Sequence, residues 1–199
     1  MKVGYVILYE DGTLTISKKY TILQKPIYKD YGEFYDTDVP WRWKNDEKKI
    51  KQVRILNQIK SNYMRSWFKD CYNLTTLIDF QNLDVSDCED FVFTFYGCKS
   101  LTNISSLKDW DVSNGKYFMW MFKHCKSLKN ILVLQNWNMY NGENFNWIFS
   151  YCINLKEIYL SDTLKCLNYL MFEGCDFNLK IHWKNKIYTY EDFIEYQEF

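Results

Sequence analysis

A histidine and a cysteine stand side by side at His124 and Cys125, within the stretch MFKHCKSL. These residue types suit two chemistries: a metal site with imidazole and thiolate ligands, or a thiol nucleophile beside its general base. Both chemistries need further partners, yet the only other histidine is His182 and the chain has no CxxC pair. A functional role for Cys125 therefore depends on whether its surroundings are unique in the sequence.

The surroundings of Cys125 are repeated. Related stretches place a phenylalanine three residues before a cysteine at 68/71, 95/98, 122/125, 149/152 and 172/175. The steps between copies are 27, 27, 27 and 23 residues. His124 occupies a position that holds Asp, Gly, Tyr and Gly in the other copies. The sequence thus predicts an architectural role for Cys125, no catalytic or metal site, no cofactor, and a protein that is not an enzyme.

Each copy combines two hydrophobic patterns. Phe91, Thr94, Phe95 and Cys98 follow the i, i+3, i+4, i+7 spacing of the buried stripe of a short helix. A leucine three residues after the cysteine and an aliphatic residue three further on predict a short strand, followed by a turn rich in Asp, Ser, Asn and Gly. Because one such unit cannot bury its apolar face alone, the copies are expected to stack.

The stretches LKDWDVSN and MFKHCKSL resemble the repeats of BspA-like bacterial leucine-rich repeat proteins, and residues 155–175 resemble a 23-residue version. The resemblance covers about residues 67–179. It implies an α/β repeat solenoid: a leucine-rich-repeat right-handed superhelix with one short parallel strand and one short helix per repeat, capped at both ends. It also implies binding in place of catalysis, and many relatives are secreted or surface-attached adhesins.

The chain divides into three segments on this interpretation. We expect an N-terminal cap or small lobe at 1–49, a solenoid of about five repeats at 50–179 and a C-terminal cap at 180–199. The first segment contains YVILYEDGTLTIS, whose alternation and Asp-Gly pair predict a β-hairpin. The last segment is expected to form a hairpin that turns at Lys184-Asn185.

Composition narrows the class of partner. The chain has 25 basic and 25 acidic residues, and this balance argues against binding driven by phosphate neutralisation. The basic cluster of Lys123, Lys126 and Lys129 is therefore interpreted as a solvated face, and nucleic acid as a less favoured partner than protein. The 8 Trp and 17 Tyr residues exceed what a core of this size needs, so some rings are expected at the surface.

Compartment is inferred from the termini and the cysteines. No stretch approaches the ~20 apolar residues that cross a bilayer, so no membrane association is expected. The first residues, MKVGYVILYEDG, lack the features of a secretory signal, and a cytoplasmic location is predicted. Seven cysteines, an odd number, favour free thiols over a disulfide framework.

Two sets of residues are candidate partner-binding residues. On the assumed helices, the position two residues before each repeated phenylalanine faces outward, and it holds Phe93, Trp120 and Trp147. Such an exposed apolar column would mark an interaction site; the alternative is that these rings fold down between neighbouring units. The second set follows the inward aliphatic residue of each strand and comprises Ile78, Leu132 and Tyr159.

The sequence therefore predicts a non-enzymatic leucine-rich-repeat binding protein. It would dock a macromolecular partner, in the first place a protein, as an intracellular inhibitor or adaptor. An inhibitor of a bacterial defence complex, encoded by a phage or another mobile element, is one specific form of this hypothesis. The alternatives are an adhesin-like surface protein whose leader is missing from this sequence, an RNA-binding solenoid, and an enzyme or thiol-based redox protein. Against the last stand the lack of a catalytic constellation and the placement of most cysteines at repeat positions, with Cys88 and Cys166 as the exceptions.

Overall fold

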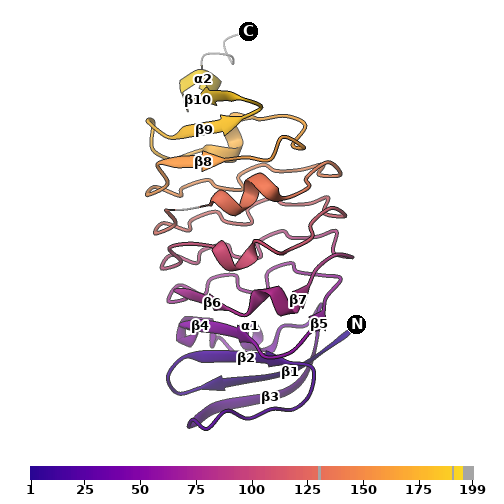
Figure 1. The fold of residues 1–199 in the computed structure, drawn as a ribbon. Coiled ribbons are helices and arrows are strands. Elements are labelled where there is room, and N and C mark those ends of the chain that lie inside the picture. The colour runs from indigo at the N-terminus through magenta and orange to yellow at the C-terminus, as the bar shows by residue number, and fades with distance from the viewer. Residues whose placement is uncertain (130, 190, 195–199) are drawn as a thin grey trace.

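The computed structural model describes residues 1–129, 131–189 and 191–194 of the chain. Successive layers of chain stack on one another from the N-terminal end, indigo in Figure 1, to the C-terminal end, yellow. The described part of the chain contains ten strands, which form three separate sheets of five, three and two strands. Within the described residues the α-helices are two four-residue turns, α1 (Pro40–Trp43) and α2 (Glu191–Ile194).

The five-stranded sheet forms the base of the stack, in the order β3-β1-β2-β4-β6. Its first three strands pair antiparallel, and β2, β4 and β6 pair parallel. The predicted hairpin is confirmed: β1 and β2 join through Gly12, whose φ of 88° suits a residue without a Cβ. The strands are β1 (Lys2–Tyr9), β2 (Thr13–Ser17), β3 (Ile27–Tyr35), β4 (Gln52–Ile55) and β6 (Thr76–Ile78).

A three-stranded sheet closes the other end, in the order β10-β9-β8. Its outer pair is the predicted C-terminal hairpin, which is confirmed: Lys184 and Asn185 have φ values of 48° and 60°, as a tight two-residue hairpin turn requires. A parallel pair, β5 with β7, forms the smallest sheet. The strands are β5 (Ile59–Lys60), β7 (Leu83–Asp84), β8 (Glu157–Tyr159), β9 (Lys180–Trp183) and β10 (Lys186–Tyr188).

Between these sheets the chain forms short 3-10 turns, and these replace the expected strand in two of the four repeats where a strand was expected, whereas β6 and β8 form in the other two. Two of them, η3 (Ser105–Leu107) and η4 (Leu132–Asn136), lie one above the other on the face seen in Figure 1. The remaining 3-10 turns are η1 (Glu47–Lys49), η2 (Phe80–Asn82) and η5 (Tyr169–Phe172).

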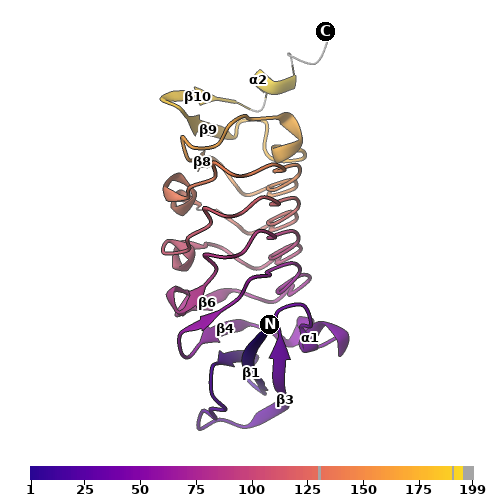
Figure 2. The ribbon, with the colours of Figure 1, turned by 90° about the vertical axis from the view of Figure 1, so that its right-hand side faces the viewer.

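Runs of consecutive turns connect the layers on the opposite side. We call the runs 64–71, 91–98, 118–125 and 145–152 the turn column; in Figure 2 they superpose along the right-hand side of the stack. Alternate amides donate to the next layer, as from Phe93 N to Met119 O at 3.2 Å. The amides between them donate back three residues within the layer, as from Tyr96 N to Phe93 O at 3.1 Å.

The structure contradicts the predicted leucine-rich-repeat solenoid. A superhelix of that kind would carry a strand and a helix in every repeat, whereas this chain forms a β-rich fold with small mixed sheets and almost no helix. The predicted helix at Phe91–Cys98 is wrong because Phe93 and Gly97 have φ values of 60° and 73°. Left-handed residues at every fourth position turn amides outward toward the next layer, so a continuous helix cannot form.

The core consists of side chains stacked from layer to layer. The repeated phenylalanines form one buried column with ring centroids 5.3, 5.5, 5.8 and 6.0 Å apart along Phe68, Phe95, Phe122, Phe149 and Phe172. A second column joins Phe80, Trp110 and Trp137, whose indole N–H groups donate across layers to Phe80 O and Leu107 O at 3.3 and 3.2 Å. The 27-residue step thus places one ring over the next from Phe68 to Phe149, and Trp137 over Trp110.

The repeated cysteines belong to this core. The Cys125 thiol donates to Phe95 O of the preceding layer at 3.2 Å, and Cys98 and Cys152 make the same contact at 3.1 Å. Burial raises the pKa of each of these three thiols, because the apolar surroundings disfavour a thiolate. Cys166, outside the repeat positions, is exposed.

This arrangement predicts selective alkylation. At pH 8 the native protein should consume one equivalent of iodoacetamide, at Cys166, because a buried thiol with a raised pKa remains protonated and unreactive. All seven cysteines should react in denaturant, and Cys166→Ser should leave the native protein unlabelled. Peptide mass spectrometry locates the label. Stoichiometric reaction of native Cys125 would contradict this account.

Candidate functional site

Phe93, Trp120 and Trp147 form a continuous stack of rings at the surface of the turn column, which we call the aromatic column. The centroids of Phe93 and Trp120 lie 4.8 Å apart and those of Trp120 and Trp147 5.4 Å apart, with the rings within 9° of parallel. Each side chain is half-buried, unlike the fully buried phenylalanine two positions later. The structure therefore brings this first set of candidate residues together.

The backbone makes these positions unusual for aromatic residues. The φ values of Phe93, Trp120 and Trp147 are 60°, 57° and 58°. A left-handed conformation costs roughly 1–2 kcal/mol for a residue with a Cβ, and glycine or asparagine adopts it more readily. Stacking on a neighbouring ring returns about 0.5–1.5 kcal/mol per pair. Stacking thus offsets part of the cost of the backbone, and a large ring at such a position supports the hypothesis of a role at the surface.

A second row of rings runs beside the aromatic column. The His124 ring stacks on Tyr151 at 4.9 Å and receives the edge of Tyr96 at 5.6 Å. Lysine ammonium groups cover both rows. Lys69 lies 4.8 Å from the Phe93 ring centroid, and Lys123 lies 5.4 Å from that of Tyr151. Cation–π contacts of this kind hold a positive charge against an apolar surface.

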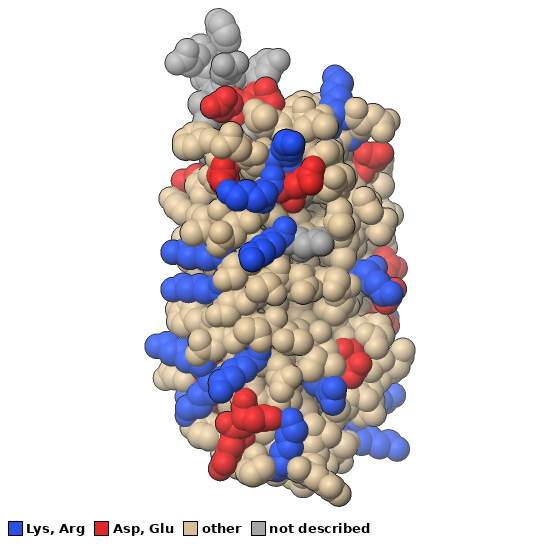
Figure 3. Space-filling view, turned by 60° about the vertical axis from the view of Figure 1, so that its left-hand side comes forward, with Lys and Arg blue, Asp and Glu red and all other residues tan. Residues whose placement is uncertain are grey.

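The neighbouring surface is basic. Lys99, His124 and Lys126 line a shallow hollow of about 270 Å³ next to Tyr96, where Asp70 is the acidic residue. Burial, followed by the charges of the surrounding lysines, lowers the pKa of His124. Figure 3 shows Lys and Arg side chains along the left-hand edge of one face, with most of the acidic side chains at its ends and right-hand edge. Within the described residues, Lys69, Lys99, Lys123 and Lys126 have no carboxylate partner.

The second candidate set is not assembled into one surface. Ile78 ends β6 and is half-buried, Leu132 begins η4 and is exposed, and Tyr159 ends β8, where its ring stacks on His182 at 4.1 Å. The equivalent residue between Ile78 and Leu132 is Ser105, which leaves no continuous apolar row. The three residues remain candidates individually, but the structure does not join them.

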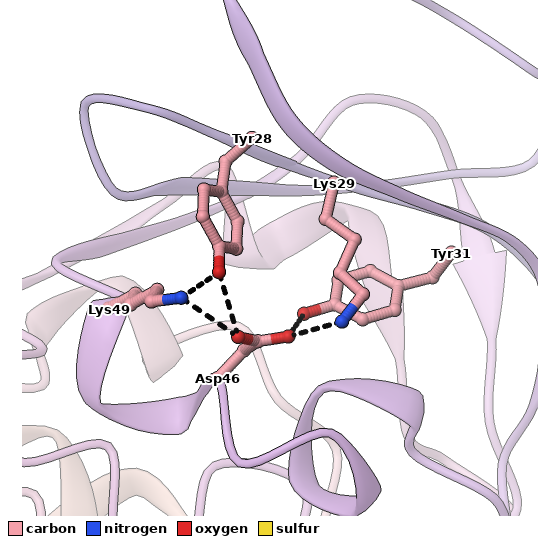
Figure 4. Close-up of polar contacts among 5 residues, drawn as sticks. All are labelled: Tyr28, Lys29, Tyr31, Asp46 and Lys49. Atoms are coloured by element: carbon pink, nitrogen blue, oxygen red, sulfur yellow. Dashed lines mark hydrogen bonds and ion pairs between the residues drawn. The ribbon is translucent and has the colours of Figure 1, made fainter.

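A dense polar cluster surrounds the buried carboxylate of Asp46, as Figure 4 shows. Lys29 and Tyr31 of β3 donate to it at 2.9 and 2.8 Å, and Lys49 of η1 and the Tyr28 hydroxyl also reach it. The Tyr31 pKa is raised, first by burial and then by this hydrogen bond. The cluster connects β3 to the loop before β4. We assign it a structural role, because donors of the chain itself satisfy the Asp46 carboxylate.

Within the described ranges, no group of three or more His, Cys, Asp or Glu side chains is arranged to hold a metal ion. No helix of the described chain has the length and apolar character needed to cross a membrane.

Sequence reasoning did not place the residues that flank the aromatic column in the candidate site, although it named Lys123 as part of a basic cluster. Tyr96 and Lys123 each lie three residues after a column residue, and Tyr151 lies four residues after Trp147. The same repeat offsets that identify the column could have found them. Residues three and four apart share a helix face, so even the predicted helix would have placed them beside the column.

The chain belongs to the family described as Mycoplasma protein of unknown function, DUF285, whose model matches residues 62–185. This match corrects the resemblance to BspA-like leucine-rich repeats, and the structure agrees, since the described residues do not form a strand and a helix in every repeat. The matched segment contains the whole aromatic column. Neither a curated protein nor a solved structure matches the chain.

The left-handed backbone of the aromatic column predicts that a glycine variant is more stable than an alanine variant, the reverse of the usual order. Trp120→Gly should be more stable than Trp120→Ala by about 1 kcal/mol, because only glycine relieves the left-handed conformation. At an ordinary exposed position alanine is the better residue. Urea unfolding measures the difference. Phe122→Ala, in the buried column, should cost ~3–5 kcal/mol and serves as the reference. An alanine variant as stable as the glycine variant would contradict the assigned backbone.

Proposed function

We propose that this protein is a non-enzymatic binding protein that docks another protein through the aromatic column and its basic flank. The observation that carries the proposal is the stack of Phe93, Trp120 and Trp147, three large rings kept half-exposed by strained backbone. Tryptophan and tyrosine dominate the energetics of protein interfaces when a partner buries them.

Charge indicates the chemistry of the partner. Among the described residues, the lysines around the column form no ion pair with a carboxylate of this chain. A partner surface with an apolar centre and flanking Asp or Glu side chains would therefore complement both the rings and the lysines. Such pairs steer association and fix orientation more than they add affinity. The partner is therefore an acidic protein, which this chain would block or recruit.

The rings favour a protein over a nucleic acid. Proteins that bind single-stranded nucleic acid present the faces of aromatic rings, on which the bases stack. In this column Trp120 has a ring stacked on each face, and Phe93 and Trp147 each have one face covered by Trp120, with centroids 4.8 and 5.4 Å apart. A cytosolic location is part of the proposal, because the free thiols of the chain persist in a reducing compartment.

The test uses affinity capture with matched variants. A protein partner should be retained by the wild type and by Tyr140→Ala, which removes an exposed ring outside the column. It should be lost with the double variant Trp120→Ala/Trp147→Ala. With the purified partner, the double variant should raise Kd by about 30-fold or more, since a buried interface tryptophan commonly contributes more than ~2 kcal/mol. Lys99→Glu/Lys126→Glu should slow association, most strongly at low salt.

Two results would overturn the proposal. One is a partner retained equally by the column variant and by Tyr140→Ala, which would place its site elsewhere. The other is retention abolished by nuclease, which would make the ligand a nucleic acid. Circular dichroism of each variant confirms that the loss of binding is not a loss of fold.

A further inference from the structure

A cleft of about 830 Å³ lies near the C-terminal end of the stack, away from the aromatic column. It is bounded by the end of η4 on one side and by the β9–β10 hairpin on the other. In Figure 2 the chain at η4 projects to the left, β8 is set back, and β10 projects again. We call this the C-terminal cleft. Its volume falls within the range of small-ligand sites.

The shorter repeat produces this cleft. The last unit has 23 residues where the preceding units have 27, and the missing residues fall where η4 projects one layer below. Met139 N donates a hydrogen bond to Thr163 Oγ1, which lies 24 residues later in the chain. Between the earlier layers, where the turn column begins, the corresponding step is longer: Phe118 N donates to Asn144 O, 26 residues later. The layer of β8 therefore runs straight and leaves η4 as an overhang. The cleft is built by the change of repeat length.

The walls of the cleft are amides and its floor is aromatic. Gln135, Asn136 and Asn138 supply exposed side-chain amides from the overhang. On the floor the Tyr159 ring stacks on His182, whose Nε2 lies 2.6 Å from Glu157 Oε1. An amide can donate and accept hydrogen bonds without carrying charge. The lining thus suits a ligand that has both an apolar face and many uncharged hydrogen-bonding groups.

One donor in the lining lacks an acceptor. The indole Nε1 of Trp183 is out of contact with solvent and has no hydrogen-bond partner among the described residues. The Lys184 ammonium lies 4.2 Å from the centroid of this ring. Because an unsatisfied buried N–H is unfavourable, an acceptor that reached Nε1 would relieve it.

We propose that the C-terminal cleft binds a neutral saccharide. A sugar ring has an apolar C–H face that packs against aromatic side chains, and a rim of hydroxyls that donate to and accept from amides. Asp162 in the lining is offset by Lys184 and Lys186, so no strong single-sign field selects a charged ligand. This site is independent of the docking function of the aromatic column, and each can fail without the other.

The test is a titration followed through the Trp183 indole N–H signal in NMR spectra. Maltotriose, cellotriose, chitotriose and mannotriose are the probes, each added to about 10 mM because single-site saccharide binding is commonly millimolar. At least one should shift the signal saturably as the N–H gains an acceptor. Asn136→Ala should weaken that binding about tenfold. Asn57→Ala, an exposed amide near β5, and Trp120→Ala should leave it unchanged.

Three outcomes overturn the proposal. The first is the absence of a saturable shift with all four trisaccharides. The second is a shift that Asn136→Ala leaves unaltered, which would place the contact outside the cleft. Trp183→Phe, which keeps a ring but removes the N–H, provides a second readout by calorimetry, and undiminished binding by this variant would also count against the site.

Discussion

The hydrogen bonds between successive layers of the turn column are the constraint on which the rest of the structure depends. Phe93 N reaches Met119 O and Trp120 N reaches Asn146 O, each 26 residues further along the chain. To aim amides at the next layer, the backbone adopts left-handed φ values at regular positions, among them Phe93 and His124. Once one layer is in register, every equivalent side chain lies directly over its predecessor, and this superposition produces both the core and the surface.

Inside the stack, superposition yields columns of rings and thiols. The Cys125 thiol satisfies a carbonyl of the previous layer at 3.2 Å, so a small polarizable group serves where a larger residue would not fit. Outside the stack, the same register aligns Phe93, Trp120 and Trp147 into one column. Where the register changes, at the 23-residue unit, the layers no longer match and the C-terminal cleft opens. The aromatic column, which is the proposed docking surface, and the cleft are thus two consequences of one repeat.

The sequence predicted the repeat and the two hairpins, because these depend on spacing and on turn residues that are visible in one dimension. It did not predict the conformation of the unit. Phe91, Thr94, Phe95 and Cys98 have the spacing of a helical stripe and are all buried, yet Phe93 between them is left-handed. A phenylalanine in the sequence does not indicate a left-handed backbone, since that conformation is imposed by hydrogen bonds to the next layer. The residues of the aromatic column were therefore identified as the outward positions of predicted helices that the structure does not contain. The C-terminal cleft was not predicted, because it depends on η4 overhanging β8.

Amide hydrogen exchange tests most directly whether the hydrogen bonds between layers position the stacked rings or depend on them. We expect the amides of Trp120, Phe122 and His124, which donate to the next layer, to exchange as slowly as those of β1, although they lie outside any strand. That protection should persist in the variant Trp120→Gly/Trp147→Gly. Fast exchange of these amides in the wild type, or its appearance when the rings are removed, would contradict the account.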